Sequence, residues 1–268
     1  LIELPEDPVV RKTAMEYLRA QGVTATDAAR LSSVASARGV ATGRSLFQED
    51  WWLQAASDGR VETVEVRWDA LPVASLSFVS YGRFRSFRRL DMPPFTRTLG
   101  PVVTLPESKP TKHALNLQRV TRELRAALPP HDRFFQLLDP EDRSAFAFSL
   151  AGLSIEQTFT FRAYPGDCRQ ALLAAVDPAT RRLIKAGSKT LSVVRHEDFA
   201  RFLRLGARDR TAEENTLDLA ALERLSAACL ERGQGTFLTV VDANGTDLAA
   251  VFLVWDERVA YYLVPFRD

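Results

Sequence analysis

A helical pattern followed by three strand-like runs occurs twice in this sequence. The first copy begins with "FQEDWWLQAAS" at Phe47 and continues through "VETVEVRW", "PVASLSFVSY" and "SFRRLDM". The second begins with "LDLAALERLSAACLERG", which has Asp218 as its expected N-cap and Gly233 as its expected stop, and continues through "TFLTVV", "DLAAVFLVW" and "VAYYLVPF". Each copy is therefore predicted to be a helix followed by an antiparallel meander.

The two copies also align at the start of their middle strands. Val73-Ala74-Ser75-Leu76 falls on Leu248-Ala249-Ala250-Val251, in each case just after a polar turn. The repeated order indicates duplication of one α+β unit. Asn244-Gly245 predicts a type I′ hairpin turn, which needs positive φ at both central residues. No segment has the composition of a long linker, so we expect the two copies to pack on each other.

The remaining segments predict helices and strands around these copies. "ALNLQRVTRELRAAL" has the spacing of an amphipathic helix, and "RFFQLLD" that of a buried strand. "EQTFTFRAY" predicts a strand with alternating Phe159 and Phe161, and "GDCRQALLAAVDPATRRLIKAGSKT" predicts two helices broken at Asp177-Pro178. "LSVV" and "HEDFARFLRLGA" follow as strand and helix. Residues 8–40 predict two short helices, interpreted as a packing appendage because the second is not basic enough for a DNA-binding helix-turn-helix.

Composition limits the partners and the compartment. The 268 residues carry 35 basic and 34 acidic side chains, a net charge of +1, so a polyanionic partner must bind a local patch. Cys168 and Cys229 form neither a disulfide framework nor a CxxC metal pattern, which fits a reducing cytosol. No apolar run approaches the ~18 residues of a membrane span, and no signal peptide is visible. We expect a cytoplasmic protein without stable membrane insertion.

The usual catalytic motifs are missing from the sequence. It contains no GxGxxG, GxxxxGK or HExxH motif and no nucleophile-elbow serine. The three histidines, His113, His131 and His196, are scattered and have no partner at metal-ligand spacing. Neither a metal site nor a covalent mechanism is expected.

Basic side chains gather in two places. Four arginines alternate with Phe84 and Phe87, and four more cations lie on the helix after Asp177; the two sets are Arg83, Arg85, Arg88 and Arg89, and Arg181, Arg182, Lys185 and Lys189. The spacing of positions 181, 185 and 189 places them on one helix face, where like charges repel unless an anion or nearby acids neutralise them. The helix is either a solvated face or a phosphate-binding surface, and the arginine run is either an edge strand or part of a site.

The stretch "MPPFTRTLGP", residues 92–101, follows the arginine run directly. Its prolines restrict the backbone, and Gly100 permits close approach of another group. It either turns a corner or lines a site.

Six segments together resemble the bacterial Fem-type aminoacyltransferases, the FemABX-like branch of the GNAT superfamily: "FQEDWWLQA", "MPPFTRTLGPVV", "LPPHDRFFQLL", "EQTFTFRAY", "DPATRRLIKAGSK" and "AAVFLVWDERVAYYLVPFRD". The resemblance covers residues 46–268 in the family's order. It implies an α+β fold of two tandem GNAT-like domains with antiparallel-rich mixed sheets, residues 46–160 and 161–268, after a helical N-terminal extension, residues 1–45. Relatives continue past the "YYL" strand with a glycine-rich turn, a helix and a last strand, so the second domain is expected to be incomplete at Asp268.

The resemblance also implies a function. Such proteins move an amino acid from aminoacyl-tRNA to an amine of a nucleotide-linked or lipid-linked peptidoglycan precursor or another small acceptor, with no further cofactor; we expect a monomer that does not bind DNA. The implied acceptor groove contains Thr96, Arg97, Thr98 and Gly100, and other substrate contacts fall on Arg181, Arg182, Lys185, Lys189 and Tyr262. Aligning the amine with the activated ester and stabilising the oxyanion would suffice, so no catalytic base is assigned.

Two alternatives stay open at this point. The same superfamily includes acyl-CoA-dependent N-acetyltransferases, which use a Q/RxxGxG/A-type pyrophosphate loop that is missing where it should follow the fourth strand. A non-catalytic anion-binding module is the other alternative, and it applies if the protein ends at Asp268 and the second domain lacks its final elements.

Overall fold

The structure is a computed structural model of the chain, and it describes residues 45–83, 87–160, 173–209 and 216–268. The chain divides into two compact units, one of residues 1–43 and 156–189 and the other of residues 44–155 and 190–268. The predicted helices in residues 8–40, the side chain of Phe161 and most of the helix predicted before Asp177 lie outside the described residues. In the first unit the structure describes helix α7 (Pro178–Gly187). The second unit contains two β-sheets.

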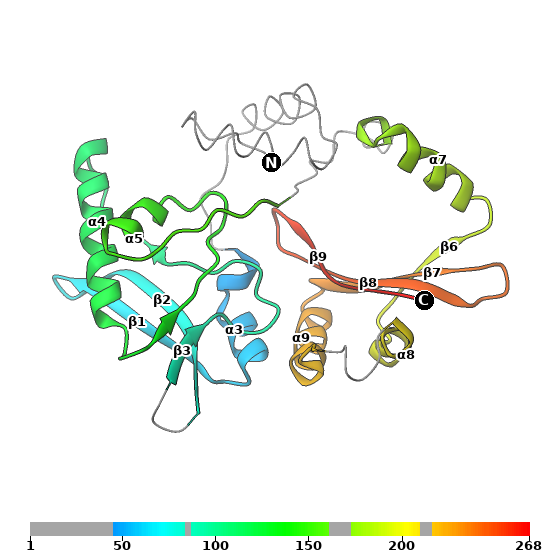
Figure 1. Cartoon of the computed structure of the whole chain (residues 1–268), viewed down its shortest axis with the longest axis horizontal. Coiled ribbons are helices and arrows are strands. Elements are labelled where there is room, and N and C mark those ends of the chain that lie inside the picture. The colour runs from blue at the N-terminus through cyan, green and yellow to red at the C-terminus, as the bar shows by residue number, and fades with distance from the viewer. Residues whose placement is uncertain (1–44, 84–86, 161–172, 210–215) are drawn as a thin grey trace. The chain divides into compact units, whose positions relative to one another are not determined.

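The first sheet follows the predicted helix and meander. Its elements are η1 (Leu46–Gln48), α3 (Asp50–Ser57), β1 (Val61–Trp68), β2 (Leu71–Arg83), β3 (Phe87–Asp91), β4 (Val102–Val103), α4 (Pro110–Ala127), β5 (Arg133–Phe134) and α5 (Ala145–Leu150). The strand order is β1-β2-β3-β5, with β4 also paired to β2, and only the β3–β5 pair is parallel. Helix α4 lies along β1 and β2 and buries Val120 and Leu124 against Leu76 and Phe78 (Figure 1).

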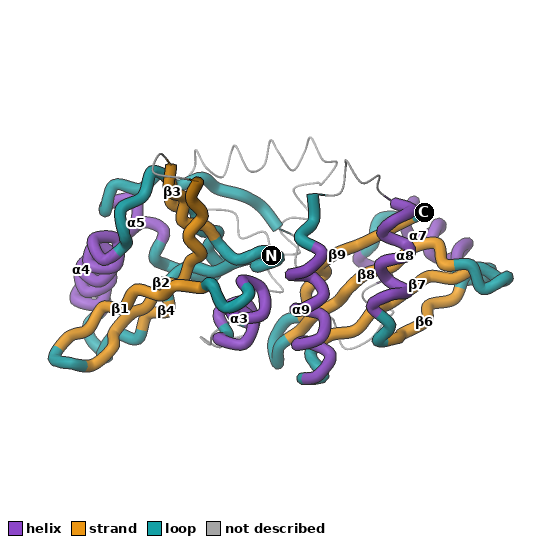
Figure 2. The backbone as a smooth tube through the Cα atoms, turned by 90° about the horizontal axis from the view of Figure 1, so that it is seen from below, coloured by secondary structure: helices purple, strands orange, loops and turns teal. Residues whose placement is uncertain are grey.

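The second sheet also confirms its predicted helix and meander. Its elements are β6 (Ser192–His196), α8 (Phe199–Asp209), α9 (Leu219–Glu231), β7 (Gly235–Val241), β8 (Asp247–Trp255) and β9 (Ala260–Arg267), and its antiparallel order is β6-β7-β8-β9. Helices α8 and α9 cover the same face of this sheet (Figures 1 and 2). Asp218 caps α9 as predicted, with its carboxylate accepting the N–H of Ala221 at 2.9 Å. Gly206 lets α8 approach β9, because a Cβ there would lie 2.7 Å from the Phe266 ring.

One hydrophobic core joins elements from both copies. Phe47 and Trp52, from the start of the first copy, are buried together with Phe237 and Phe252 of the second sheet. The Phe47 ring lies 4.6 Å from the Tyr261 ring of β9, centroid to centroid. The two copies therefore pack on each other, as expected without a long linker.

Two predicted strands differ from the structure. Strand β5 covers only Arg133–Phe134 of the predicted "RFFQLLD" strand, because its partner β3 ends before Pro93 and Pro94, which have no N–H to extend the ladder. Residues 156–160 form no strand; their side chains are exposed, and no strand in the described ranges pairs with them.

The turn at Asn244-Gly245 is not type I′. Of these two residues only Gly245 has positive φ, at 82°. The Gly245 N–H donates to the carbonyl of Asp242, and the Asp242 carboxylate accepts the N–H groups of Asn244 and Thr246 at 2.9 and 2.8 Å. Capture by this carboxylate favours a longer turn that places a single residue in the left-handed region.

Candidate functional site

The proline-rich stretch interrupts the strand that returns along β2. Strand β2 pairs with β3 from Arg83 opposite Phe87 to Val79 opposite Asp91. Its pairing resumes with β4, where Ser75 lies opposite Val102. Between these pairs β2 advances through residues 76–78, whereas the returning chain makes an excursion through residues 92–101. The Gln136 side chain fills the gap, since its Nε2 donates to the carbonyl of Ser77 at 2.9 Å and its Oε1 accepts the N–H of Gly100 at 3.0 Å.

Strand β9 is interrupted too, by a bulge at Leu263. Phe252 pairs with Val264 and Leu253 with Tyr262, so Leu263 is an extra residue without a partner on β8. A bulge releases backbone groups from the ladder. The Arg97 guanidinium donates a hydrogen bond to the Leu263 carbonyl. The interruption in the first sheet therefore contacts the interruption in the second.

An open groove of about 480 Å³ lies where the two interruptions meet. Three segments line it: residues 94–97 of the excursion, residues 216–218 before α9, and residues 263–265 of β9. Pro265 faces Val251 across the ladder and has no N–H, so this part of the edge cannot pair normally with another strand. The walls are mostly apolar, and Arg97 and Asp218 supply the charged side chains.

The structure separates the predicted groove residues into two groups. Thr96 and Arg97 line the groove. Thr96 is nevertheless buried, and its Oγ1 accepts the indole N–H of Trp52 at 3.1 Å, so this hydroxyl anchors the excursion. Arg97 is exposed, and within the described residues it has no ion pair with a carboxylate. Tyr262, next to the bulge, is 64% exposed.

Thr98 and Gly100 are not among the groove-lining residues. The Thr98 hydroxyl is buried and has no hydrogen bond within the described part of the chain. Gly100 has a φ of 74°, and a Cβ there would lie 2.8 Å from both the Asp142 carboxylate and the Leu138 side chain. The close approach that this glycine permits is thus to protein groups.

Helix α7 carries the predicted basic residues in a different arrangement. The helix ends at Gly187, so Lys189 lies beyond it, and of the predicted row of positions 181, 185 and 189 only Arg181 and Lys185 lie on the helix. Arg181 donates to the carbonyls of Ala174 and Val176 at 2.8 and 2.7 Å, which holds the preceding turn. Arg182, Lys185 and Lys189 are exposed and have no ion pair among the described residues.

The titratable groups that the structure describes outside the groove do not make a reactive centre. Cys229 is buried in the core, and burial raises the pKa of its thiol to about 12, so it is not a nucleophile at neutral pH. Burial also raises the pKa of Asp142, whose carboxylate accepts the N–H of Ser144. In the described residues no group of His, Cys, Asp and Glu has the geometry of a metal site, and no helix there has the length and hydropathy to cross a bilayer.

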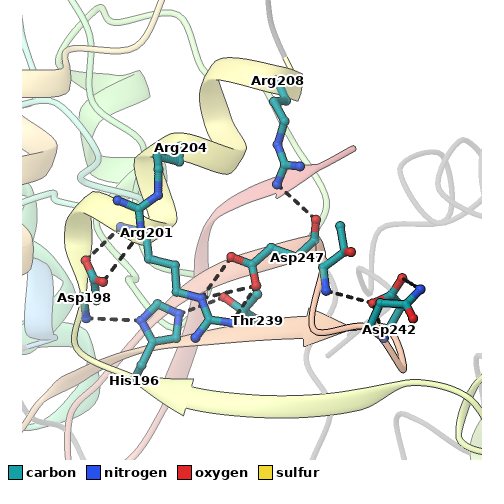
Figure 3. A network of polar contacts seen from close by, with 10 residues as sticks. His196, Asp198, Arg201, Arg204, Arg208, Thr239, Asp242 and Asp247 are labelled. Atoms are coloured by element: carbon teal, nitrogen blue, oxygen red, sulfur yellow. Dashed lines mark hydrogen bonds and ion pairs between the residues drawn. The ribbon is translucent and has the colours of Figure 1, made fainter.

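A polar network around His196 ties α8 to the second sheet (Figure 3). His196 accepts the N–H of Asp198 at Nδ1, so its Nε2 carries the proton that is shared with the Thr239 hydroxyl at 2.8 Å. Arg201 makes a bidentate ion pair with Asp247. Burial first, and then the Arg201 charge, lower the pKa of His196. These side chains satisfy one another, which indicates a structural role.

Sequence patterns missed the partners that complete the groove. The bulge at Leu263 lies inside a continuous strand pattern, and only Pro265 signalled an irregular edge. Phe95 and Leu217 also line the groove, and neither was singled out from the sequence. Gln136 had no local signal, because its two partners lie 36 and 59 residues away.

Comparisons with known proteins identify the fold. No protein-family model and no curated protein sequence matches this chain. Among solved structures, the chain is similar to the crystal structure of FemX, with a TM-score of 0.52 and 12% sequence identity over 85% of this chain and 76% of the FemX chain. At this identity the likeness shows a shared fold, an α+β arrangement with mixed and antiparallel sheets.

Proposed function

We propose that this chain is an aminoacyltransferase that moves an amino acid from aminoacyl-tRNA to an amine of a peptidoglycan precursor or another small anionic acceptor. The observation that carries the proposal is the bulge at Leu263, which lies in the wall of an open groove and is held by Arg97. The FemX-like fold and the resemblance of residues 46–268 to Fem-type enzymes support it.

The groove is proposed to supply what acyl transfer requires. The acceptor nitrogen attacks the carbonyl carbon of the aminoacyl ester, an amide bond forms, the ester C–O bond breaks, and the tRNA hydroxyl leaves with the proton that the amine loses. The negative charge on the carbonyl oxygen needs hydrogen-bond donors fixed before the reaction. A backbone N–H of the bulge is proposed to be such a donor, and alignment of the two substrates would supply the rest of the rate enhancement.

Arg97 is proposed to hold the acceptor. Its guanidinium gives one hydrogen bond to the Leu263 carbonyl and retains further donors and its full charge. A carboxylate or phosphate of the acceptor would bind these donors next to the bulge. Exposed Tyr262 is proposed as a second contact, whereas Thr98 and Gly100 are proposed to support the excursion indirectly.

Helix α7 is proposed to contact the tRNA backbone. Arg182, Lys185 and Lys189 are exposed cations without acidic partners in the described residues, and phosphate contacts of this kind supply most nonspecific nucleic-acid affinity. Arg181 would act through the helix, because its guanidinium is already bound to backbone carbonyls.

The two sheets are proposed to be duplicated GNAT-like domains. Both middle strands carry a bulge at the same aligned residue, Val73 in β2 and Leu248 in β8. Sequence alignment and bulge position therefore agree on the same pair of residues, which supports common ancestry of the two sheets.

A labelled transfer assay tests the function. The protein is incubated with a pool of radiolabelled aminoacyl-tRNAs and peptidoglycan precursor, with and without RNase, and separately with labelled acetyl-CoA. We expect label in the acceptor from the tRNA pool alone, abolished by RNase. Label from acetyl-CoA alone would replace the proposal with an acetyltransferase, and label from neither donor would contradict transfer to this acceptor.

A further inference from the structure

Phe95 has an unusual backbone conformation for its side chain. Its φ is 60°, in the left-handed region that bulky residues rarely occupy. Among the residues that the structure describes, the other non-glycine residues with positive φ are Asp58, at the C-cap of α3, and Asp69 and Ala70, in the tight turn between β1 and β2. Those positions are ordinary left-handed sites, whereas Phe95 follows two prolines in a groove wall.

Contacts on both sides impose this conformation. The Thr96 N–H donates to the carbonyl of Pro93 at 3.3 Å, closing a turn in which Phe95 takes the position that favours glycine. The Trp52 indole holds the Thr96 hydroxyl, and Arg97 is bound to β9. The excursion is thereby fixed at both residues after Phe95, so its backbone cannot relax without breaking these bonds.

The side chain gives a reason for this strained position. Phe95 is half-buried: it packs against the core that contains Phe47 and Phe252, and it also lines the groove. Glycine would fit the backbone better but would leave this part of the wall empty. Strain retained at a cleft is a pointer to a function of the side chain that occupies it.

We propose that Phe95 determines which amino acid is transferred, by packing against the side chain of the aminoacyl group. This inference rests on the proposed function. That side chain starts at the carbon bonded to the reacting carbonyl, so it must lie close to the bulge. The wall there is formed by Leu263, Pro265 and Phe95, which favours an apolar side chain large enough to touch the ring.

The test compares transfer ratios in one reaction. The full chain receives equal amounts of leucyl-tRNA and seryl-tRNA with distinguishable labels, and the ratio of leucine to serine in the product is measured. We expect wild-type protein to favour leucine and Phe95→Ala to reduce that ratio about tenfold. Phe95→Leu, which keeps an apolar side chain, should stay within about threefold of wild type. Partial unfolding lowers both products equally, so it leaves the ratio unchanged.

A second measurement tests the backbone strain without any substrate. Phe95→Gly and Phe95→Ala both remove the ring, but only glycine suits a positive φ, so the glycine variant should melt about 2–4 °C higher. An unchanged leucine-to-serine ratio in Phe95→Ala, or a wild-type preference for serine, would overturn the selectivity proposal. No transfer by wild-type protein from either tRNA would instead refute the proposed function for these donors and, with it, this inference.

Discussion

The strands that return along β2 and β8 are both interrupted, but to very different extents. In the first sheet the interruption is the excursion of residues 92–101, opposite residues 76–78 of β2. In the second it is one bulged residue, Leu263, between the partners of Phe252 and Leu253. The alignment of Val73 with Leu248 makes residues 251–253 of the second copy equivalent to residues 76–78 of the first. The two interruptions therefore lie at equivalent positions of the two copies.

The two interruptions contribute different parts of the groove wall. The long excursion supplies a wall with the side chains of Phe95 and Arg97, and the single bulge supplies backbone groups at β9. If the sheets arose by duplication, the same irregular point became a side-chain wall in one copy and a backbone site in the other.

Deleting the bulge should have the largest effect on activity. Removal of Leu263 would restore a regular β8–β9 ladder, in which Tyr262 and Val264 keep their partners Leu253 and Phe252 but the extra backbone groups beside the groove are lost. Misplacement of the site by an ångström can cost about a hundredfold in rate. Deleting Val73, the bulge residue of β2, should destabilise the first sheet while the folded fraction keeps its rate. The transfer rates of the two variants are compared after each is divided by the folded fraction, which is measured by circular dichroism. Equal losses in the two deletions would remove the special role of β9.

Removing the link between the interruptions should have an intermediate effect. Arg97→Ala loses the bond to the Leu263 carbonyl and the proposed acceptor anchor, so we expect about tenfold weaker transfer at low acceptor concentration and about 1 kcal/mol less stability. Arg88→Ala on β3, an exposed arginine away from the groove, is the matched control and should change neither by much. The acceptor dependence of the rate and urea denaturation report the two effects. A rate loss in Arg88→Ala as large as that in Arg97→Ala would argue against a local role.

The smallest effect should come from pH and be confined to the second sheet. The pKa of His196 is lowered in the folded protein, so its protonation favours the unfolded chain. Its contribution to stability is therefore complete above the unfolded pKa of about 6.5 and declines as the pH falls below that value. Urea midpoints at pH 7.5 and pH 5.5 should differ less in His196→Gln than in wild type. His131→Gln, outside this network, should keep the wild-type difference.

Local signals predicted most of the fold, and long-range pairing decided the rest. The Asp218 cap and the two meanders followed from patterns within a few residues. The turn at Asn244 was assigned the wrong type because the Asp242 carboxylate competes for its N–H groups. In the groove, the motif around Thr96 and Arg97 was recognisable, but register across β8 and β9 creates the bulge and leaves no pattern in β9 alone.

Cys229 offers a way to time the opening of the second sheet. Cys229 lies in the core beneath Gly235, where a Cβ on residue 235 would come within 2.7 Å of the Cys229 Cβ atom. At neutral pH its thiol is protonated and hidden from solvent. An alkylating reagent can modify it only when α9 and β7 separate. In a Cys168→Ser background, the rate of labelling at this sulfur would therefore report how often the core around it opens. It would also report how much a ligand in the groove slows that opening.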